Sequence, residues 1–115
     1  MRVIIQTPDF KASKKLTEFV RENVEKISFL SDRVLEGQVL LKVEKSATNE
    51  NKICQLKVII PGNDIFASRQ STTFEEAVSQ AVEAAEHQIM RWKESRSGKQ
   101  VRGSFVLPEE EETFP

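Results

Sequence analysis

Apolar and polar positions repeat with two different periods along the chain, and these periods divide it into six elements. Residues 2–7 form a short β-branched run that Pro8 and Asp9 close, which predicts a strand. Over residues 13–30 the apolar positions recur at steps of three and four. That spacing predicts an amphipathic helix, with Ser13 as its N-cap.

The middle of the chain alternates with a period of two. Residues 39–44 and 53–60 each place every second apolar side chain on one face, as strands do. Turn-forming residues separate them at 47–51, and a Pro-Gly-Asn-Asp sequence at 61–64 precedes a third short strand at 65–68. Short connections predict that the three strands pair as an antiparallel meander.

A second helical stripe follows the strands. Thr72 and Thr73 stand at capping-box spacing from Glu75 and Glu76, and the apolar stripe then continues over residues 74–96. After Gly98 the periodicity stops, so we expect the helix to end near Arg96.

The predicted order is therefore β-α-β-β-β-α. Each helix has one apolar face, and packing both helices on one face of a four-stranded sheet is the simplest way to bury them. This α+β fold is similar to the double-stranded-RNA-binding domain. We expect residues 1–96 to form the folded domain and residues 97–115 a flexible tail, basic first and acidic at its end.

Composition narrows the function mainly by exclusion. The 115 residues suffice for one domain, and 17 basic against 18 acidic residues give a net charge of −1, so only the distribution of charge can indicate a nucleic-acid partner. No run is long and apolar enough to span a membrane, and the N-terminus lacks the features of a signal peptide, so a cytoplasmic location is expected.

No arrangement of residues indicates catalysis. The chain has one Cys and one His, too few for a disulfide or a metal cage, and it has no phosphate-binding glycine loop. Cys54 is interpreted as a core residue, because a free thiol packs as a small apolar group. His87 is interpreted as a surface side chain. We expect no enzyme activity, no cofactor, no metal and no small-molecule substrate.

Basic residues are the main candidates for a binding site. Between His87 and Arg102 there are five cations and one acid, a local charge of +4. The helix dipole favours cations near a helix C-terminus, which accounts for Arg96 but not for Lys99 or Arg102 beyond Gly98. Such a cluster is typical of a phosphate-contacting surface.

The first helix is ambiguous, because its cations alternate with glutamates at pairing distance. A salt-bridged face and an RNA-binding stripe fit it equally well. We expect the cations of both helices and the second strand to converge on one surface. The candidate RNA-binding residues are Lys14, Lys15, Arg21, Lys26, Lys42, Lys45, Arg91, Lys93 and Arg96.

Four segments carry a resemblance to a known family. QVLLKVEK at 38–45, IFAS at 65–68, TFEEAV at 73–78 and HQIMRWKE at 87–94 resemble the ribosome hibernation factors and ribosome-associated translation inhibitors, also called the sigma-54 modulation protein family. The likeness covers about residues 1–96. It implies a ribosome-associated protein that contacts 16S rRNA on the 30S subunit or the 70S ribosome. It would occupy the mRNA and tRNA channel and inhibit translation in stationary phase or stress.

The resemblance extends to individual residues. Lys26, Lys42, Lys45, Arg91 and Lys93 stand where the family carries basic residues. The chain departs from the family at four positions where relatives often have cations, namely Thr17, Asn23, Ala84 and His87.

The end of the chain bears on subtype. SerPheVal at 104–106 before the glutamates at 109–112 resembles the tail of the inhibitor branch, in which the tail follows the mRNA path. The LKVEK strand resembles the hibernation-promoting branch instead. The acidic run would also be able to screen the basic cluster when RNA is absent.

Two other functions fit the sequence. A general double-stranded RNA-binding protein would share the α-β-β-β-α order and would recognise duplex shape. A modulator of a transcription factor, which the older family name suggests, would fit the nearly neutral net charge.

Overall fold

The structure, a computed structural model, describes residues 1–45 and 50–102, with side chains described as far as residue 95 in the last helix. The predicted element order and the α+β class are confirmed. The elements are β1 (Arg2–Gln6), α1 (Lys14–Glu25), the 3-10 helix η1 (Lys26–Phe29), β2 (Glu36–Val43), β3 (Lys52–Ile59), β4 (Ile65–Ser71) and α2 (Phe74–Arg102).

The four strands form one sheet in the order β1-β2-β3-β4. β2, β3 and β4 pair antiparallel, as the short connections predicted, and β1 joins the edge parallel to β2. In this register Val39, Leu56 and Ala67 lie side by side across three strands. The alternating apolar positions therefore fall on a single face.

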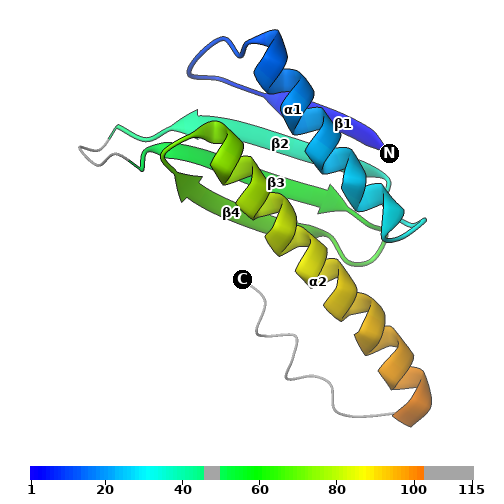
Figure 1. Ribbon diagram of the computed structural model, residues 1–115. Helices are drawn as coiled ribbons and strands as arrows, with labels where there is room; N and C mark the ends of the chain where they lie inside the picture. Colours follow the sequence, from blue (N-terminus) through cyan, green and yellow to red (C-terminus); the bar gives the residue numbers. More distant parts are fainter. Residues whose placement is uncertain (46–49, 103–115) are drawn as a thin grey trace.

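Both helices cover that face and run side by side across it (Figure 1). Every second strand residue points under them, and their own apolar stripes close the core. The largest fully buried side chains are Ile27, Leu41, Leu56, Ile60, Ile89, Val20, Val24, Val39, Val58, Val78 and Cys54. At Gly37 a Cβ atom would lie 2.8 Å from Val24 Cγ1 and 2.7 Å from Met1 Cε, so β2 needs glycine where α1 packs against it.

The caps that begin the helices match the sequence. The Ser13 hydroxyl accepts a hydrogen bond from the Leu16 N–H at 3.0 Å, and the Thr73 hydroxyl accepts one from the Glu76 N–H at 3.1 Å. The rings of Phe10 and Phe74, which precede and open the two helices, stack with centroids 4.8 Å apart. Both helices therefore start at the same end of the sheet.

The helix ends differ from the prediction. The stripe predicted over residues 13–30 divides into α1 and η1, and α2 continues past Arg96 to Arg102. A glycine inside a helix costs only about 1 kcal/mol relative to alanine, and no proline follows Gly98 until residue 108, so the helix continues through it. Residues 104–112, which carry the subtype features, lie outside the described part of the chain.

Candidate nucleic-acid interface

Two opposite ends of the sheet carry the predicted cations. At the helix-start end, where α1 and α2 begin, the Asp9 carboxylate accepts a hydrogen bond from the Val43 N–H at 3.1 Å. At the helix-exit end, the Gln88 side-chain amide donates to the Phe66 carbonyl at 2.9 Å. Both helices run from the first end to the second (Figure 1).

The helix-exit end brings together residues far apart in the sequence. Lys26 opens η1, and Arg91 and Lys93 lie on the part of α2 that passes η1. The Lys93 ammonium donates to the Leu30 carbonyl at 2.5 Å, which ties α2 to the chain after η1. Arg33, exposed in the same connection, was not predicted as a site residue. We call Lys26, Arg33, Arg91 and Lys93 the exit cluster.

The exit cluster suits a phosphate-rich ligand. Lys26, Arg33, Arg91 and Lys93 are all exposed. An ammonium has three N–H donors, so the bond from Lys93 to Leu30 leaves donors that can reach a phosphate. Arg96 belongs to the same helix, and its side chain lies outside the described part.

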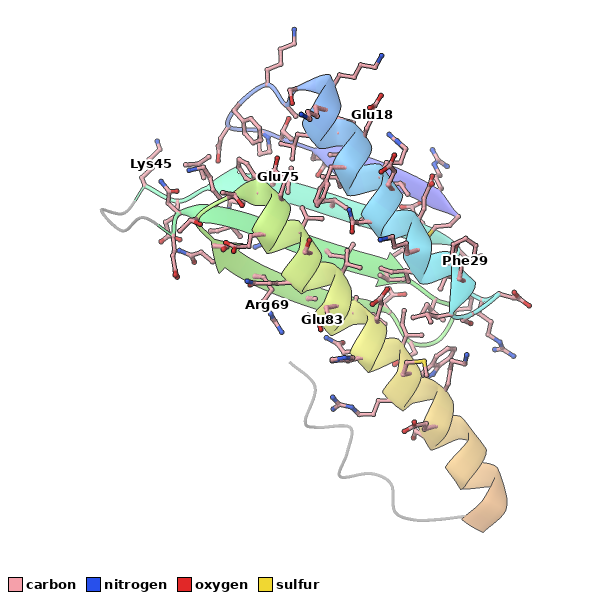
Figure 2. All side chains as sticks on the ribbon, in the orientation of Figure 1. Glu18, Phe29, Lys45, Arg69, Glu75 and Glu83 are labelled. Carbon is pink, nitrogen blue, oxygen red and sulfur yellow. The ribbon has the colours of Figure 1, made fainter. Side chains whose placement is uncertain are left out.

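The other predicted cations lie elsewhere, so the expectation of one convergent surface is wrong. Lys14 and Lys15 open α1 at the helix-start end, and Lys45 follows β2 there. Figure 2 shows Lys45 and Phe29, a residue of η1, at opposite ends of the molecule. The reason is topological, because β2 runs from the helix-exit end to the helix-start end and carries Lys42 and Lys45 away from Lys26.

Lys42 and Arg21 have positions of their own. Lys42 follows the fully buried Leu41 along β2, so its side chain lies on the sheet face that the helices leave uncovered. Arg21 donates from its guanidinium to the Val3 carbonyl at 3.4 Å, across the outer edge of β1. This bond gives Arg21 a structural role, because it covers unpaired backbone groups of an edge strand.

Up to Met90, the exposed surface of α2 is acidic. Residues 74–90 of α2 contain four glutamates and neither Lys nor Arg. Figure 2 shows Glu75 and Glu83 on α2 and Glu18 on α1. The positions where relatives often have cations are neutral here, and Asn23 and Thr17 donate instead to carbonyls of their own helix, Phe19 and Ser13, at 2.8 and 3.0 Å. Phosphates would be repelled from this part of α2 and attracted to the exit cluster that follows it.

Among the described side chains, five exposed cations were not predicted as site residues: Arg2, Lys11, Arg33, Lys57 and Arg69. Arg33 fell in a segment interpreted only as a polar break, where no periodicity assigns a face. Lys57 lies between the buried Leu56 and Val58 on β3, and it is exposed on the uncovered face. The alternation of apolar and polar residues in that strand places Lys57 on the uncovered face, so this residue was predictable from the sequence alone.

The remaining reactive side chains have ordinary surroundings. Cys54 is buried in the core, as predicted, and burial raises the pKa of its thiol from 9.0 to about 12. His87 is exposed on α2, also as predicted. Within the described residues, no three acidic, His or Cys side chains are grouped so as to hold a metal ion, and no helix there is long and apolar enough to cross a membrane.

Comparisons with known proteins agree with the motifs and the topology. A family model described as "Sigma 54 modulation protein / S30EA ribosomal protein" matches residues 3–97. No curated protein sequence matches the chain. A ribosomal subunit interface protein from Coxiella burnetii has a similar structure, with a TM-score of 0.71 and 19% identity, over 81% of this chain and 98% of the other.

The N-terminal domain of Protein Y from Thermus thermophilus is also similar, with a TM-score of 0.70 and 16% identity, over 80% of this chain and 99% of that one. At these identities, the two structures establish that the fold is shared.

Proposed function

The chain belongs to the Sigma 54 modulation protein / S30EA ribosomal protein family, as its motifs indicated, and from this premise we propose that it is a cytoplasmic ribosome-associated factor that inhibits translation. It binds 16S rRNA of the 30S subunit, free or within the 70S ribosome, in the channel used by mRNA and tRNA. Its role is ribosome hibernation in stationary phase or stress.

The exit cluster is the observation that supports this proposal beyond family membership. Four exposed cations from three separate parts of the chain lie at one end of the domain, and more cations follow along α2. Cations placed in this way neutralise backbone phosphates and fix the orientation of the bound protein. A folded domain held in the channel then excludes mRNA and tRNA by its volume, and this needs no reaction centre.

The cations at the helix-start end provide a second proposed contact. Lys14, Lys15 and Lys45 lie at the opposite end of the sheet from the exit cluster. A contact at each end would hold the domain across the channel while its glutamates face away from phosphates.

Co-sedimentation with 30S and 70S particles tests the proposal. We expect Arg91→Glu, Lys93→Glu and Arg96→Glu together to abolish co-sedimentation, because three phosphate contacts would become repulsive. Single Arg91→Glu and Arg69→Glu variants form a matched pair, since each changes the net charge equally and the exposed Arg69 of β4 belongs to neither proposed contact. Unchanged binding of the triple variant, or equal losses in the pair, would exclude the exit cluster as the contact.

The same preparation separates the alternative functions. Equal affinity for an arbitrary RNA duplex and for ribosomes would favour a general double-stranded RNA binder. Recovery of RNA polymerase components without ribosomes would favour a transcription modulator.

A further inference from the structure

The sheet face opposite the helices is not covered by any element of the described chain. Strand alternation identifies its members, because they are the residues between the buried ones. Its apolar members are half-buried or exposed, and Phe66 is 44% exposed. The residues of this open face are Arg2, Ile4, Gln6, Glu36, Gln38, Leu40, Lys42, Ile53, Gln55, Lys57, Ile59, Phe66, Ser68 and Gln70.

The chemistry of the open face differs from that of the helical face. It carries three cations, Arg2, Lys42 and Lys57, against one acid, Glu36, whose carboxylate already accepts a hydrogen bond from the Gln38 amide at 2.6 Å. Four glutamine amides stand among these charges. On the helical face, α2 carries four glutamates and neither Lys nor Arg up to Met90, whereas the open face has a net excess of positive charge.

An aromatic ring and a cation stand next to each other on this face. Phe66 of β4 is directly opposite Lys57 of β3, and Lys57 is directly opposite Gln38 of β2. A depression of about 320 Å³ begins beside this row, and its lining includes Ile4, Leu40, Gln55 and Lys57. Amide side chains at its rim have both donors and acceptors for base edges.

We propose that the open face binds a single-stranded RNA segment. A base stacks on Phe66, Lys57 contacts the adjacent phosphate, Lys42 contacts a phosphate further along the strand, and the glutamines meet the base edges. Exposed aromatics beside cations on a sheet are the means by which proteins bind unpaired strands, since every base has a face that can stack.

The two lysines are suitably spaced for an RNA strand that runs diagonally over the sheet, mostly along the direction of β2 and β3. Lys42 is opposite Ile53, and Lys57 is four residues further along β3, which is about 13 Å at the usual strand rise. The proposal rests on the proposed function, because a protein in the mRNA channel lies among unpaired RNA. It gives Lys42, which the topology separates from the exit cluster, a site of its own.

Fluorescence anisotropy of the full chain with a labelled twelve-nucleotide oligouridylate, in the absence of ribosomes, tests the proposal. We expect Phe66→Ala to weaken binding at least about fivefold, because one stacking contact is lost. Phe66→Tyr should restore it, because the stacking ring returns. Lys57→Glu should weaken binding to a similar extent and flatten its salt dependence.

Two control variants match these changes. Phe29→Ala removes a phenylalanine that is 85% exposed on η1, and Lys11→Glu reverses a charge away from the open face. Both should retain the affinity of the unmodified chain. Undetectable binding of the oligonucleotide, or losses as large in the two controls, would overturn the proposal.

Two further readouts keep this test separate from the ribosome test. Sedimentation equilibrium should find the same oligomeric state for the unmodified chain and for Phe66→Ala. A dimer that Phe66→Ala dissociates would show that the open face binds protein, and would overturn the proposal.

The triple exit-cluster variant should still bind the oligonucleotide through the open face. If it binds oligonucleotide but not ribosomes, the open-face proposal stands, and loss of oligonucleotide binding in that variant overturns it.

Discussion

The two halves of α2 differ in charge, burial and consequence. The packed half, residues 74–89, buries six side chains against the sheet and carries four glutamates without a Lys or Arg. The distal half, residues 90–102, extends past the sheet and carries the cations (Figure 1). Apart from Trp92, which packs against the core, one continuous helix separates the residues that stabilise the fold from those proposed to contact RNA, so the two functions can be disrupted independently.

The largest expected difference in stability is between two adjacent residues at the boundary between the packed half and the distal half. Ile89 is fully buried and Met90 is 42% exposed. We expect Ile89→Ala to lower the free energy of unfolding by about 2–5 kcal/mol, because it leaves a cavity in the core. Met90→Ala should change it by less than about 0.5 kcal/mol, as is usual for surface substitutions. Urea denaturation measures both, and similar losses would show that the distal half is packed as well.

Sequence patterns predicted the packed half better than the distal half, and the reason is physical. Ala77, Ala81 and Ile89 recur with the helical period because these positions must be buried. Buried strand residues recur with a period of two for the same reason, so the core and the sheet could be predicted from the sequence. Exposed cations have no such constraint. Lys26 and Lys93 lie at the same end only because η1 packs beside α2, and the direction of β2 carries Lys42 away from that end.

The end of α2 was not predictable from the sequence, whereas the family was. The apolar stripe in the sequence ends at Trp92, so the end of α2 at Arg102 has no apolar signature. The family was recognisable from short motifs such as LKVEK and TFEEAV, and its model match confirms it. The nine candidate RNA-binding residues remain predictions, and the structure divides them between the helix-exit end, the helix-start end, the β1 edge and the open face.

Cys54 reports on the core under the packed half through the pH dependence of stability. Burial raises the pKa of its thiol from 9.0 to about 12, so the unfolded chain loses this proton at lower pH than the folded chain does. Stability must therefore fall as pH rises above 9. Between pH 8 and pH 10, this group should lower the free energy of unfolding by about 1.4 kcal/mol.

Cys54→Ala is the control, because it should lack that part of the pH dependence while other groups titrate unchanged. Denaturation curves at several pH values measure the difference between the two chains. An identical pH dependence in both would mean that the thiol is not buried in solution.

Arg91 tests the distal half by its salt dependence. If Arg91 contacts one phosphate, Arg91→Gln should reduce the slope of log affinity against log salt concentration by about 0.9 in ribosome binding. The packed-half variant Glu83→Gln should leave the slope unchanged, because a glutamate neutralises no phosphate and its replacement removes no phosphate contact. Filter binding at several salt concentrations measures both slopes. An unchanged slope in Arg91→Gln would remove this residue from the phosphate contacts.

Replacing a glycine in the distal half, or introducing one in the packed half, should have the smallest effects on stability. Comparing the two changes tests which part of α2 unfolds together with the sheet. Gly98 lies inside the distal half, and alanine there favours the helix by about 1 kcal/mol. Because the distal half adds little packing to the sheet, Gly98→Ala should raise the helical circular dichroism signal slightly and leave Tm unchanged. Gln80 is exposed on the packed half, so Gln80→Gly should cost a similar amount but lower Tm by several degrees, since that half unfolds with the sheet. A rise in Tm for Gly98→Ala would mean that the distal half folds cooperatively with the core, and the separation between the two halves of α2 would then fail.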